Sequence, residues 1–289
     1  MIASVLVIGA GTMGVGIAEV SARAGARTLL YDVEAPRVRT ALDRIAGSLA
    51  KAAEKAKISK EDADAARARI EGLTDLGAAN VDLVIEAVFE DLVLKKKLVA
   101  ELTARGSPIF ASNTSSLSIT EIASAAKDPG RVIGLHFFNP APVMALVELV
   151  LAEQTSPETL ATARAFVEKA GKSPIVVNDT PGFASSRLGI ITGMEAIRML
   201  ESGVASAEDI DRAMELGYRH PMGPLKLTDL VGLDVRLAIA EHLTKEIGPQ
   251  FTPPPILRRL VRAGKLGKKT GEGFYLWDGE VARPKPKRG

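Results

Sequence analysis

Residues 5–18 read VLVIGAGTMGVGIA, an apolar run that leads directly into the motif G-x-G-x-x-G. The run predicts a buried strand, and the spacing of the apolar residues behind the motif predicts a helix. In this setting Gly9 permits a tight turn, Gly11 allows close approach to a pyrophosphate, and Gly14 allows helix and strand to pack closely. The helix N-terminus also offers free N–H groups to an anion. The segment therefore predicts a dinucleotide site that includes Gly9, Gly11, Met13 and Gly14.

The identity of the dinucleotide depends on the end of the next predicted strand, residues 27–31. Asp32 stands there, eighteen residues after Gly14. A carboxylate at this point accepts hydrogen bonds from the adenosine ribose hydroxyls and repels a 2′-phosphate. Arg37 and Arg39 follow closely and keep NADP open as the alternative. The pattern favours NAD.

Two apolar runs, residues 132–135 and 145–151, flank the turn Asn-Pro-Ala-Pro at 139–142. Such runs around a turn predict neighbouring strands. Glu148 lies inside the second run, where burial of a carboxylate costs free energy unless a donor meets it. His136 ends the first run, and a histidine held by a carboxylate is a usual form of a general base. The alternative is that Glu148 lies exposed on an edge strand and His136 is merely packed.

A polar loop lies between these two motifs. Residues 112–117 read SNTSSL and directly follow the predicted strand 108–112. A loop at the carboxyl end of a parallel strand faces the ligand crevice. Its serines can bind a substrate oxygen, or they can cap the helix that follows. Because His136 ends the next strand, we favour a polar cluster centred on Ser115 and His136.

The order of elements predicts an α/β fold, with a Rossmann-type dinucleotide-binding domain over residues 1–182. Behind the break at Thr180-Pro181-Gly182 the pattern predicts helices only, so we expect an all-α C-terminal domain over residues 183–282. The predicted helix 183–201 is apolar over most of its circumference, which indicates burial within its domain or against a partner chain. We therefore expect a homodimer or a higher homo-oligomer formed through this domain. Residues 283–289 are basic, and we expect a disordered tail.

Composition indicates an enzyme with no metal and no nucleic-acid partner. The chain has 289 residues, 46% of them hydrophobic and 25% charged, and its net charge of +2 arises from mixed signs. It has no cysteine, which excludes thiolate chemistry, and its three scattered histidines argue against a metal site. No apolar run is long enough to cross a membrane, and the chain begins directly with a strand. We therefore expect no membrane span, no signal peptide and a cytoplasmic location.

The chain as a whole resembles the L-3-hydroxyacyl-CoA dehydrogenase family, and most closely its short single-function bacterial members that act on 3-hydroxybutyryl-CoA. The most specific segment is His-Phe-Phe-Asn-Pro at 136–140, with a glutamate twelve residues after the histidine. The resemblance extends from residue 1 to about residue 277. Its other segments are residues 9–14, 86–90, 112–117, 179–183, 220–224, 229–234 and 271–275.

The resemblance implies a role for each candidate catalytic residue. His136 would be the catalytic base, Glu148 its orienting partner, and Ser115 the donor to the 3-oxygen of the substrate. One position departs from the family pattern. Family members often have asparagine three residues after the Pro-Gly-Phe phenylalanine, Phe183, and this chain has Ser186. A serine still donates one hydrogen bond but lacks the reach and the second polar group of an amide, which puts the contribution of Ser186 in question.

The resemblance also implies the binding residues and the reaction. Asp32, Glu90, Lys95 and Asn139 would line the NAD site, and Ser48 and Lys55 would hold the CoA moiety. The reaction would be the reversible, NAD-dependent oxidation of a short-chain L-3-hydroxyacyl-CoA to the 3-ketoacyl-CoA. Two alternatives stay open, a dehydrogenase of a free hydroxy acid with the same fold and a catalytically silent, cofactor-binding structural protein.

Overall fold

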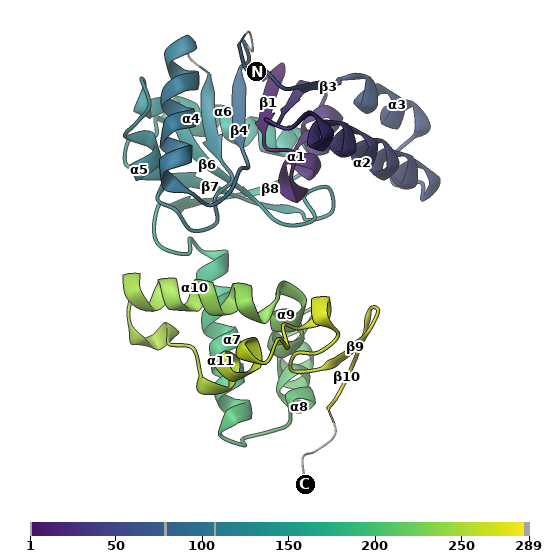
Figure 1. Ribbon diagram of the computed structural model, residues 1–289, viewed down its shortest axis with the longest axis vertical. Helices are drawn as coiled ribbons and strands as arrows, with labels where there is room; N and C mark the ends of the chain where they lie inside the picture. The colour runs from purple at the N-terminus through teal and green to yellow at the C-terminus, as the bar shows by residue number, and fades with distance from the viewer. Residues whose placement is uncertain (1, 78–79, 107, 286–289) are drawn as a thin grey trace. The chain divides into compact units, whose positions relative to one another are not determined.

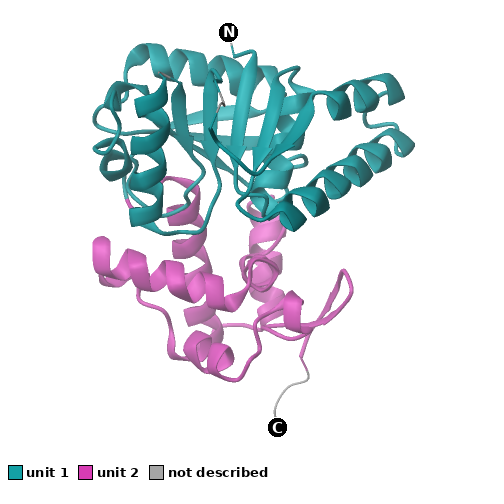
Figure 2. Ribbon diagram, turned by 45° about the horizontal axis from the view of Figure 1, so that its top comes forward, with its two compact units in different colours: residues 1–180 teal, residues 181–289 magenta. Residues whose placement is uncertain are grey.

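The computed structural model describes residues 2–77, 80–106 and 108–285. The chain divides into two compact units, Met1–Thr180 and Pro181–Gly289, which we call unit 1 and unit 2 (Figure 2). Each unit has its own hydrophobic core.

Unit 1 contains an eight-stranded sheet in the order β3-β2-β1-β4-β5-β6-β7-β8 (Figure 1). All neighbouring strands are parallel except β6 and β7, which pair antiparallel. The strands are β1 (Ser4–Ile8), β2 (Arg27–Tyr31), β3 (Ile70–Leu73), β4 (Leu83–Glu86), β5 (Ile109–Ser112), β6 (Val132–Phe137), β7 (Leu146–Leu151) and β8 (Ser173–Asn178).

The helices of unit 1 connect these strands, and the core lies between the helices and the sheet. Val5 and Val7 of β1 and Ile17 of α1 are almost completely buried in it. Helices α2 and α3 pack on each other and on β3, at the end of the sheet that β3 forms (Figure 1). The helices are α1 (Thr12–Arg23), α2 (Ala35–Glu54), α3 (Lys60–Ala68), α4 (Leu92–Arg105), α5 (Ile119–Ala123) and α6 (Pro157–Lys169), with a short 3-10 turn η1 (Pro129–Arg131).

The strand order reverses at β1. Strands β2 and β3 follow on one side of it, and β4, β5 and β6 follow on the other. In open α/β sheets the carboxyl ends of the two strands at such a reversal are where ligands bind. The fold predicted for this half of the chain is therefore confirmed. Strand β3 was not predicted, because it has four residues, contains Gly72 and is only partly buried.

Unit 2 is mostly helical. Its core includes Ile190 and Met194 of α7, Leu225 of α9, Leu243 of α10 and Phe274. Its elements are α7 (Ser185–Glu201), α8 (Ala207–Arg212), the π-helical turn η2 (Ala213–Gly217), α9 (Pro224–Val231), α10 (Leu233–Glu246), η3 (Pro249–Phe251), α11 (Pro255–Arg262), η4 (Lys268–Thr270) and the antiparallel pair β9 (Leu276–Asp278) and β10 (Val281–Arg283).

Three expectations for unit 2 need correction. The single helix expected over residues 225–247 is two helices, because Gly232 has φ +106°, a left-handed conformation that ends α9. The domain is not purely α-helical, since β9 and β10 form a hairpin. The disordered tail expected from residue 283 is wrong for residues 283–285. Arg283 ends β10, and Lys285 forms an ion pair with Glu272 at 2.8 Å. Residues 286–289 lie outside the described residues.

Candidate active site

The glycine turn lies at the carboxyl end of β1. Gly9 has φ +102°, and a Cβ atom placed on it would lie 2.7 Å from the carbonyl oxygen of Ala87. A Cβ on Gly14 would lie 1.7 Å from the carbonyl oxygen of Gly9. Neither position accepts a side chain. A Cβ on Gly11, by contrast, meets nothing within 4 Å, so the backbone at the start of α1 is open to a ligand. This combination of tight turn and open helix N-terminus fits a pyrophosphate.

Asp32 lies beside this turn. Its carboxylate accepts hydrogen bonds from the backbone N–H of Ala10 at 2.9 Å and of Glu34 at 3.1 Å, and only 8% of the residue is exposed. Each carboxylate oxygen has a second acceptor site, so the group is fixed and can still accept ribose hydroxyls. Arg37 is the arginine closer to Asp32 in sequence of the two that left NADP as an alternative. It forms an ion pair with Glu34 at 3.0 Å.

His136 and Glu148 face each other on adjacent strands. They are register partners in the antiparallel pair β6 and β7, and Nδ1 of His136 lies 2.7 Å from Oε2 of Glu148. Glu148 is completely buried, and His136 is 7% exposed. The predicted pairing of the strands is confirmed, and the alternative of an exposed Glu148 is wrong. With Nδ1–H donating to the carboxylate, Nε2 is the ring atom that can accept a proton.

The loop that follows β5 reaches the strand that carries His136. The side-chain oxygen of Asn113 accepts the backbone N–H of Phe137 at 2.9 Å. The helix after the loop, α5, is capped by Ser118, whose hydroxyl accepts the N–H of Glu121 at 3.1 Å. Capping of α5 therefore does not account for Ser115. Ser115 is half-buried, and its backbone N–H donates to Glu90 at 2.9 Å.

Glu90 and Lys95 belong to an ion-pair cluster. Lys95 is 1% exposed, and its Nζ lies 2.7 Å from Glu86 and 3.3 Å from Glu90. Burial opposes ionisation of Glu90, but Lys95 and the hydrogen bonds from Thr114 and Ser115 outweigh it, so the pKa of this carboxyl is below its usual value. Sequence reasoning gave no role to Glu86. The available signal was similar to that for Glu148, a carboxylate within an apolar stretch, although Glu86 ends its run and Glu148 lies inside one.

The other candidates lie on several elements. Met13 packs partly against the core of unit 1, and Asn139 is exposed three residues after His136. Ser48, half-buried, and Lys55, exposed, lie on α2 and at its C-cap. Neither has a hydrogen bond or ion pair, within the described ranges, to the His136 pair. Ser186 lies in the first turn of α7, in unit 2.

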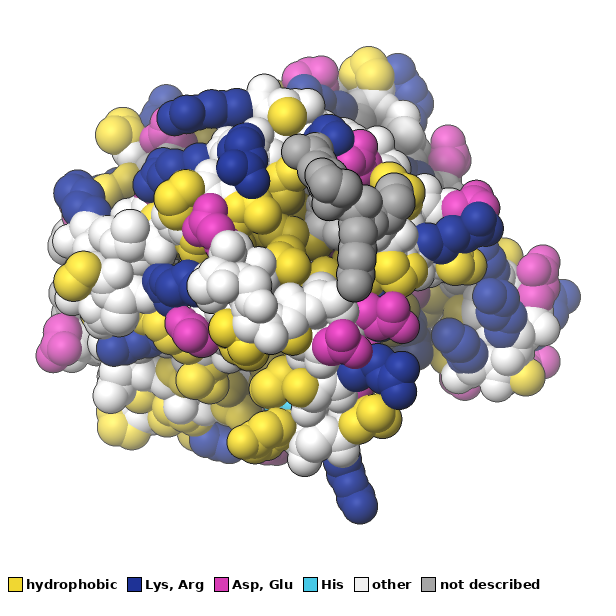
Figure 3. Space-filling view, turned by 90° about the horizontal axis from the view of Figure 1, so that it is seen from below, with side chains coloured by type: hydrophobic (Ala, Val, Ile, Leu, Met, Phe, Trp, Pro, Cys, Tyr) yellow, Lys and Arg dark blue, Asp and Glu magenta, His cyan; other side chains and the backbone are white. Residues whose placement is uncertain are grey.

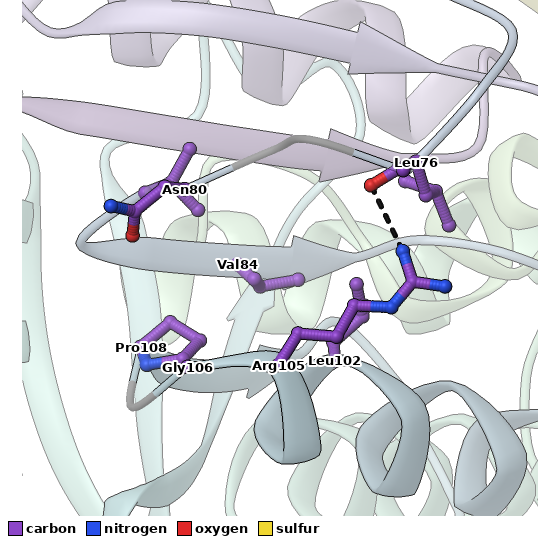
Figure 4. A pocket seen from close by; sticks show the side chains of 9 residues that line it. Leu76, Asn80, Val84, Leu102, Arg105, Gly106 and Pro108 are labelled. Carbon is purple, nitrogen blue, oxygen red and sulfur yellow. Dashed lines mark hydrogen bonds between the residues drawn. The ribbon is translucent and has the colours of Figure 1, made fainter.

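The cavity in Figure 4 is not part of this site. It measures about 430 Å³ and lies where β4 and β5 begin, with Arg105 donating to the carbonyl oxygen of Leu76 at 3.1 Å. Asp32 and His136 lie at or near the opposite, carboxyl ends of their strands. In the part of the chain that the structure describes, no group of acidic or histidine side chains suits a metal ion, and no helix could span a membrane.

Comparison with known proteins adds to this geometry. The family model described as "3-hydroxyacyl-CoA dehydrogenase, NAD binding domain" matches residues 4–180, and "3-hydroxyacyl-CoA dehydrogenase, C-terminal domain" matches residues 182–277. The chain is 43% identical to a 3-hydroxybutyryl-CoA dehydrogenase of Mycobacterium tuberculosis, over 94% of this chain and 97% of that protein. It is 45% identical to a probable 3-hydroxybutyryl-CoA dehydrogenase of Bacillus subtilis, over 96% and 98%.

A solved structure gives the same result. The crystal structure of (S)-3-hydroxybutyryl-CoA dehydrogenase from Ralstonia eutropha superposes with a TM-score of 0.91 at 42% identity, and the match covers 96% of this chain and 100% of that one. Agreement extends through both matched regions, so the likeness is not confined to the widespread dinucleotide-binding fold. The chain therefore belongs to the 3-hydroxyacyl-CoA dehydrogenase family, with the NAD-binding domain of that family in its first part.

Proposed function

We propose that this protein catalyses the reversible, NAD-dependent oxidation of L-3-hydroxyacyl-CoA to 3-ketoacyl-CoA. The observation that carries the proposal is the buried His136–Glu148 pair at 2.7 Å, in the same sheet as a glycine turn suited to a dinucleotide. A buried carboxylate that orients a histidine is costly to maintain and is a recurring feature of proton-transfer sites.

The proposed mechanism assigns proton transfer to His136. The substrate's 3-hydroxyl lies between Ser115 and Nε2 of His136, and Nε2 accepts the hydroxyl proton as the carbon–oxygen double bond forms. Glu148 accepts the Nδ1–H, which fixes the tautomer and stabilises the imidazolium that results. In the reverse direction the imidazolium is the acid. The cofactor, when bound, supplies the two-electron redox chemistry.

The remaining candidates are binding residues in this proposal. The start of α1, with Gly9, Gly11, Met13 and Gly14, holds the pyrophosphate, and Asp32 holds the adenosine ribose. Asn139 lies beside the nicotinamide, and Glu90 and Lys95 line the cofactor site. Ser48 and Lys55 hold the CoA moiety. Ser186 adds one donor to the substrate. Relatives named for 3-hydroxybutyryl-CoA support a short acyl chain as substrate.

A homo-oligomer formed through unit 2 is also part of the proposal. Unit 2 exposes several large apolar side chains, which is the kind of surface that a second copy covers. Figure 3 shows hydrophobic side chains among charged ones on one face of the molecule. The exposed apolar residues of unit 2 include Leu188, Leu227, Leu230, Val231 and Val235. A cytoplasmic location stays a prediction.

Steady-state kinetics tests the function. We expect turnover of 3-hydroxyacyl-CoA with NAD, the highest kcat/KM at four to six carbons in a series from four to about sixteen, and a much lower kcat/KM with NADP because Asp32 repels its 2′-phosphate. Free 3-hydroxybutyrate is the control substrate. Faster turnover of the free acid would favour the hydroxy-acid dehydrogenase alternative, and absence of turnover with every substrate would favour the silent structural protein.

A further inference from the structure

Glu86 joins three elements at the carboxyl end of β4. One oxygen of its completely buried carboxylate accepts from Lys95 Nζ of α4 at 2.7 Å and from the backbone N–H of Val88 at 2.7 Å. The other oxygen accepts from the hydroxyl of Ser112, at the end of β5, at 2.7 Å. A carboxylate with three donors at this distance is firmly held.

Lys95 links Glu86 to Glu90, because its ammonium contacts both carboxylates. Its ammonium is 1% exposed and lies between the two carboxylates, at 2.7 Å and 3.3 Å. A cation in this position balances a buried negative charge, and loss of either partner leaves an uncompensated charge in the interior.

Glu90 in turn holds the loop that carries Ser115. Its Oε1 accepts the hydroxyl of Thr114, the backbone N–H of Ser115 at 2.9 Å and the hydroxyl of Ser116 at 3.2 Å. On its other side the loop is tied to β6 through the hydrogen bond between Asn113 and the N–H of Phe137. Every residue from 112 to 116 is thus bonded either to this carboxylate cluster or to the strand of His136.

We propose that Glu86 and Lys95 are positioning residues for the loop Ser112–Ser116. They hold Glu90 in place, and Glu90 sets where the Ser115 hydroxyl stands relative to His136. The inference rests on the proposed function, because it takes Ser115 as the donor to the substrate's 3-oxygen. It assigns Lys95 a role in arranging the loop, in addition to the cofactor contact that the family resemblance implies.

The test is a double-mutant cycle between Glu86→Gln and Ser115→Ala. Glutamine keeps the size of residue 86, removes its charge and replaces one acceptor oxygen with an NH₂ donor. Because small misplacement of a reacting group is enough to slow chemistry, we expect Glu86→Gln to lower kcat about 10- to 100-fold. The dissociation constant of NADH should change less than about threefold. In the Ser115→Ala background, Glu86→Gln should lower kcat by less than about twofold further, because the two residues act through one hydroxyl.

Controls separate positioning from support of the fold. Glu71→Gln removes a carboxylate of β3 that pairs with Arg27 at 3.2 Å outside the cluster, and it should leave kcat unchanged. If Glu86→Gln does not fold, Ser112→Ala removes one hydroxyl of the same cluster and enters the cycle in its place. Effects of residues 86 and 115 that multiply, or an NADH dissociation constant that rises in step with the loss of kcat, would overturn the inference. Absence of wild-type turnover would instead overturn the proposed function.

Discussion

At the scale of single residues, the structure pairs most of its buried charges. Glu148 lies against His136, and Glu86 lies against Lys95. Arg236 of α10 has no opposite charge against it among the described residues. It is 6% exposed, its Nε has no hydrogen-bond partner among the described residues, and burial lowers its pKa to about 10. We expect substitutions in the paired groups to change activity, and we expect substitution of Arg236 to change stability.

Substitution of the proposed base should separate chemistry from binding. A positioned general base contributes ~10²–10⁴ in rate, so His136→Gln should lower kcat by about that factor with little change in NAD affinity. Glu148→Gln should also be severe, because an amide can present its NH₂ group to the ring. Steady-state kinetics together with NADH titration measures both quantities. Near-normal turnover of the His136 variant would contradict the mechanism.

Arg236→Met should stabilise the protein. Methionine has a similar length and removes a buried charge that has no ion pair among the described residues, so we expect a gain of about 1–3 kcal/mol in the free energy of unfolding. Denaturant unfolding measures it. Arg259, exposed on α11, is the matched control, and Arg259→Met should change the free energy by less than about 0.5 kcal/mol. A loss of stability that deepens with dilution would show instead that Arg236 meets a carboxylate of a second copy.

At the scale of elements, α9 anchors the C-terminal segment of unit 2. The carboxylate of Asp229 accepts the backbone N–H groups of Phe274 at 2.8 Å and Tyr275 at 2.9 Å, and the indole N–H of Trp277 at 2.8 Å. A Cβ on Gly273 would lie 2.1 Å from the same carboxylate. This segment can therefore pack on α9 because residue 273 is a glycine and because Asp229 offers an acceptor to each of the three N–H groups.

Asp229→Asn should loosen this contact. Both oxygens of Asp229 are acceptors, so an amide NH₂ would face at least one N–H donor, and we expect a loss of about 1–3 kcal/mol. Denaturant unfolding measures the loss, and Asp278→Asn on the exposed hairpin is the control. Unchanged stability of the Asp229 variant would mean that the segment does not depend on this carboxylate.

The same variant should alter the pH dependence of stability. Burial raises the pKa of Asp229 above its usual 3.8 and outweighs the hydrogen bonds that lower it. At pH values between 3.8 and the folded pKa, the folded protein therefore holds a proton that the unfolded chain has released. This contribution to stability is fully present below about pH 3.8 and is lost as pH rises through the folded pKa. The stability difference between wild type and Asp229→Asn should thus shrink as the pH rises through that window.

Helix α2 carries the proposed CoA contact. Ser48 and Lys55 are seven residues apart and lie on one face of a helical path. If Lys55 meets the CoA phosphates, Lys55→Ala should raise the KM for acetoacetyl-CoA, leave the KM for NADH unchanged, and lose its effect at high salt. Lys57→Ala is the control on the same basic stretch. Lys55→Ala should not change the KM for a pantetheine-truncated substrate, which lacks the nucleotide phosphates. An equal rise in KM for the full and the truncated substrate would contradict a role of Lys55 in CoA binding.

At the scale of the whole molecule, two units with separate cores divide the chain at residue 180. The cofactor residues assigned here belong to unit 1. Ligand binding to a folded unit stabilises that unit by mass action. Stability in the presence of NAD therefore tests the cofactor site without reference to catalysis.

NAD at about 100 times its dissociation constant should raise the free energy of unfolding by about 2.7 kcal/mol. The same concentration of NADP should give a smaller rise, and Asp32→Ala should reduce the rise with NAD without a matching gain with NADP. Calorimetry of wild type and variant with each dinucleotide measures these differences. Equal stabilisation of the wild type by NAD and NADP would contradict the role of Asp32.

The sequence by itself determined the glycine turn, Asp32, and the pairing of His136 with Glu148. Each of these depends on residue type at a short spacing, and the turn between β6 and β7 makes their register a local property. A buried carboxylate can also be recognised in the sequence when it interrupts an apolar run, because it needs a hydrogen-bond or charged partner. The family resemblance extended this reading to residues on α2 and α7.

Only the tertiary structure decided the partners of residues far apart in the chain. Ser112 reaches Glu86 across 26 positions, and Phe274 reaches Asp229 across 45. It also decided that Gly232 divides a predicted helix, because a glycine in a helical pattern is tolerated or breaks the helix according to what packs around it. Periodicity reports which face of an element is buried, whereas hydrogen-bond partners and left-handed turns depend on the contacts that folding brings together.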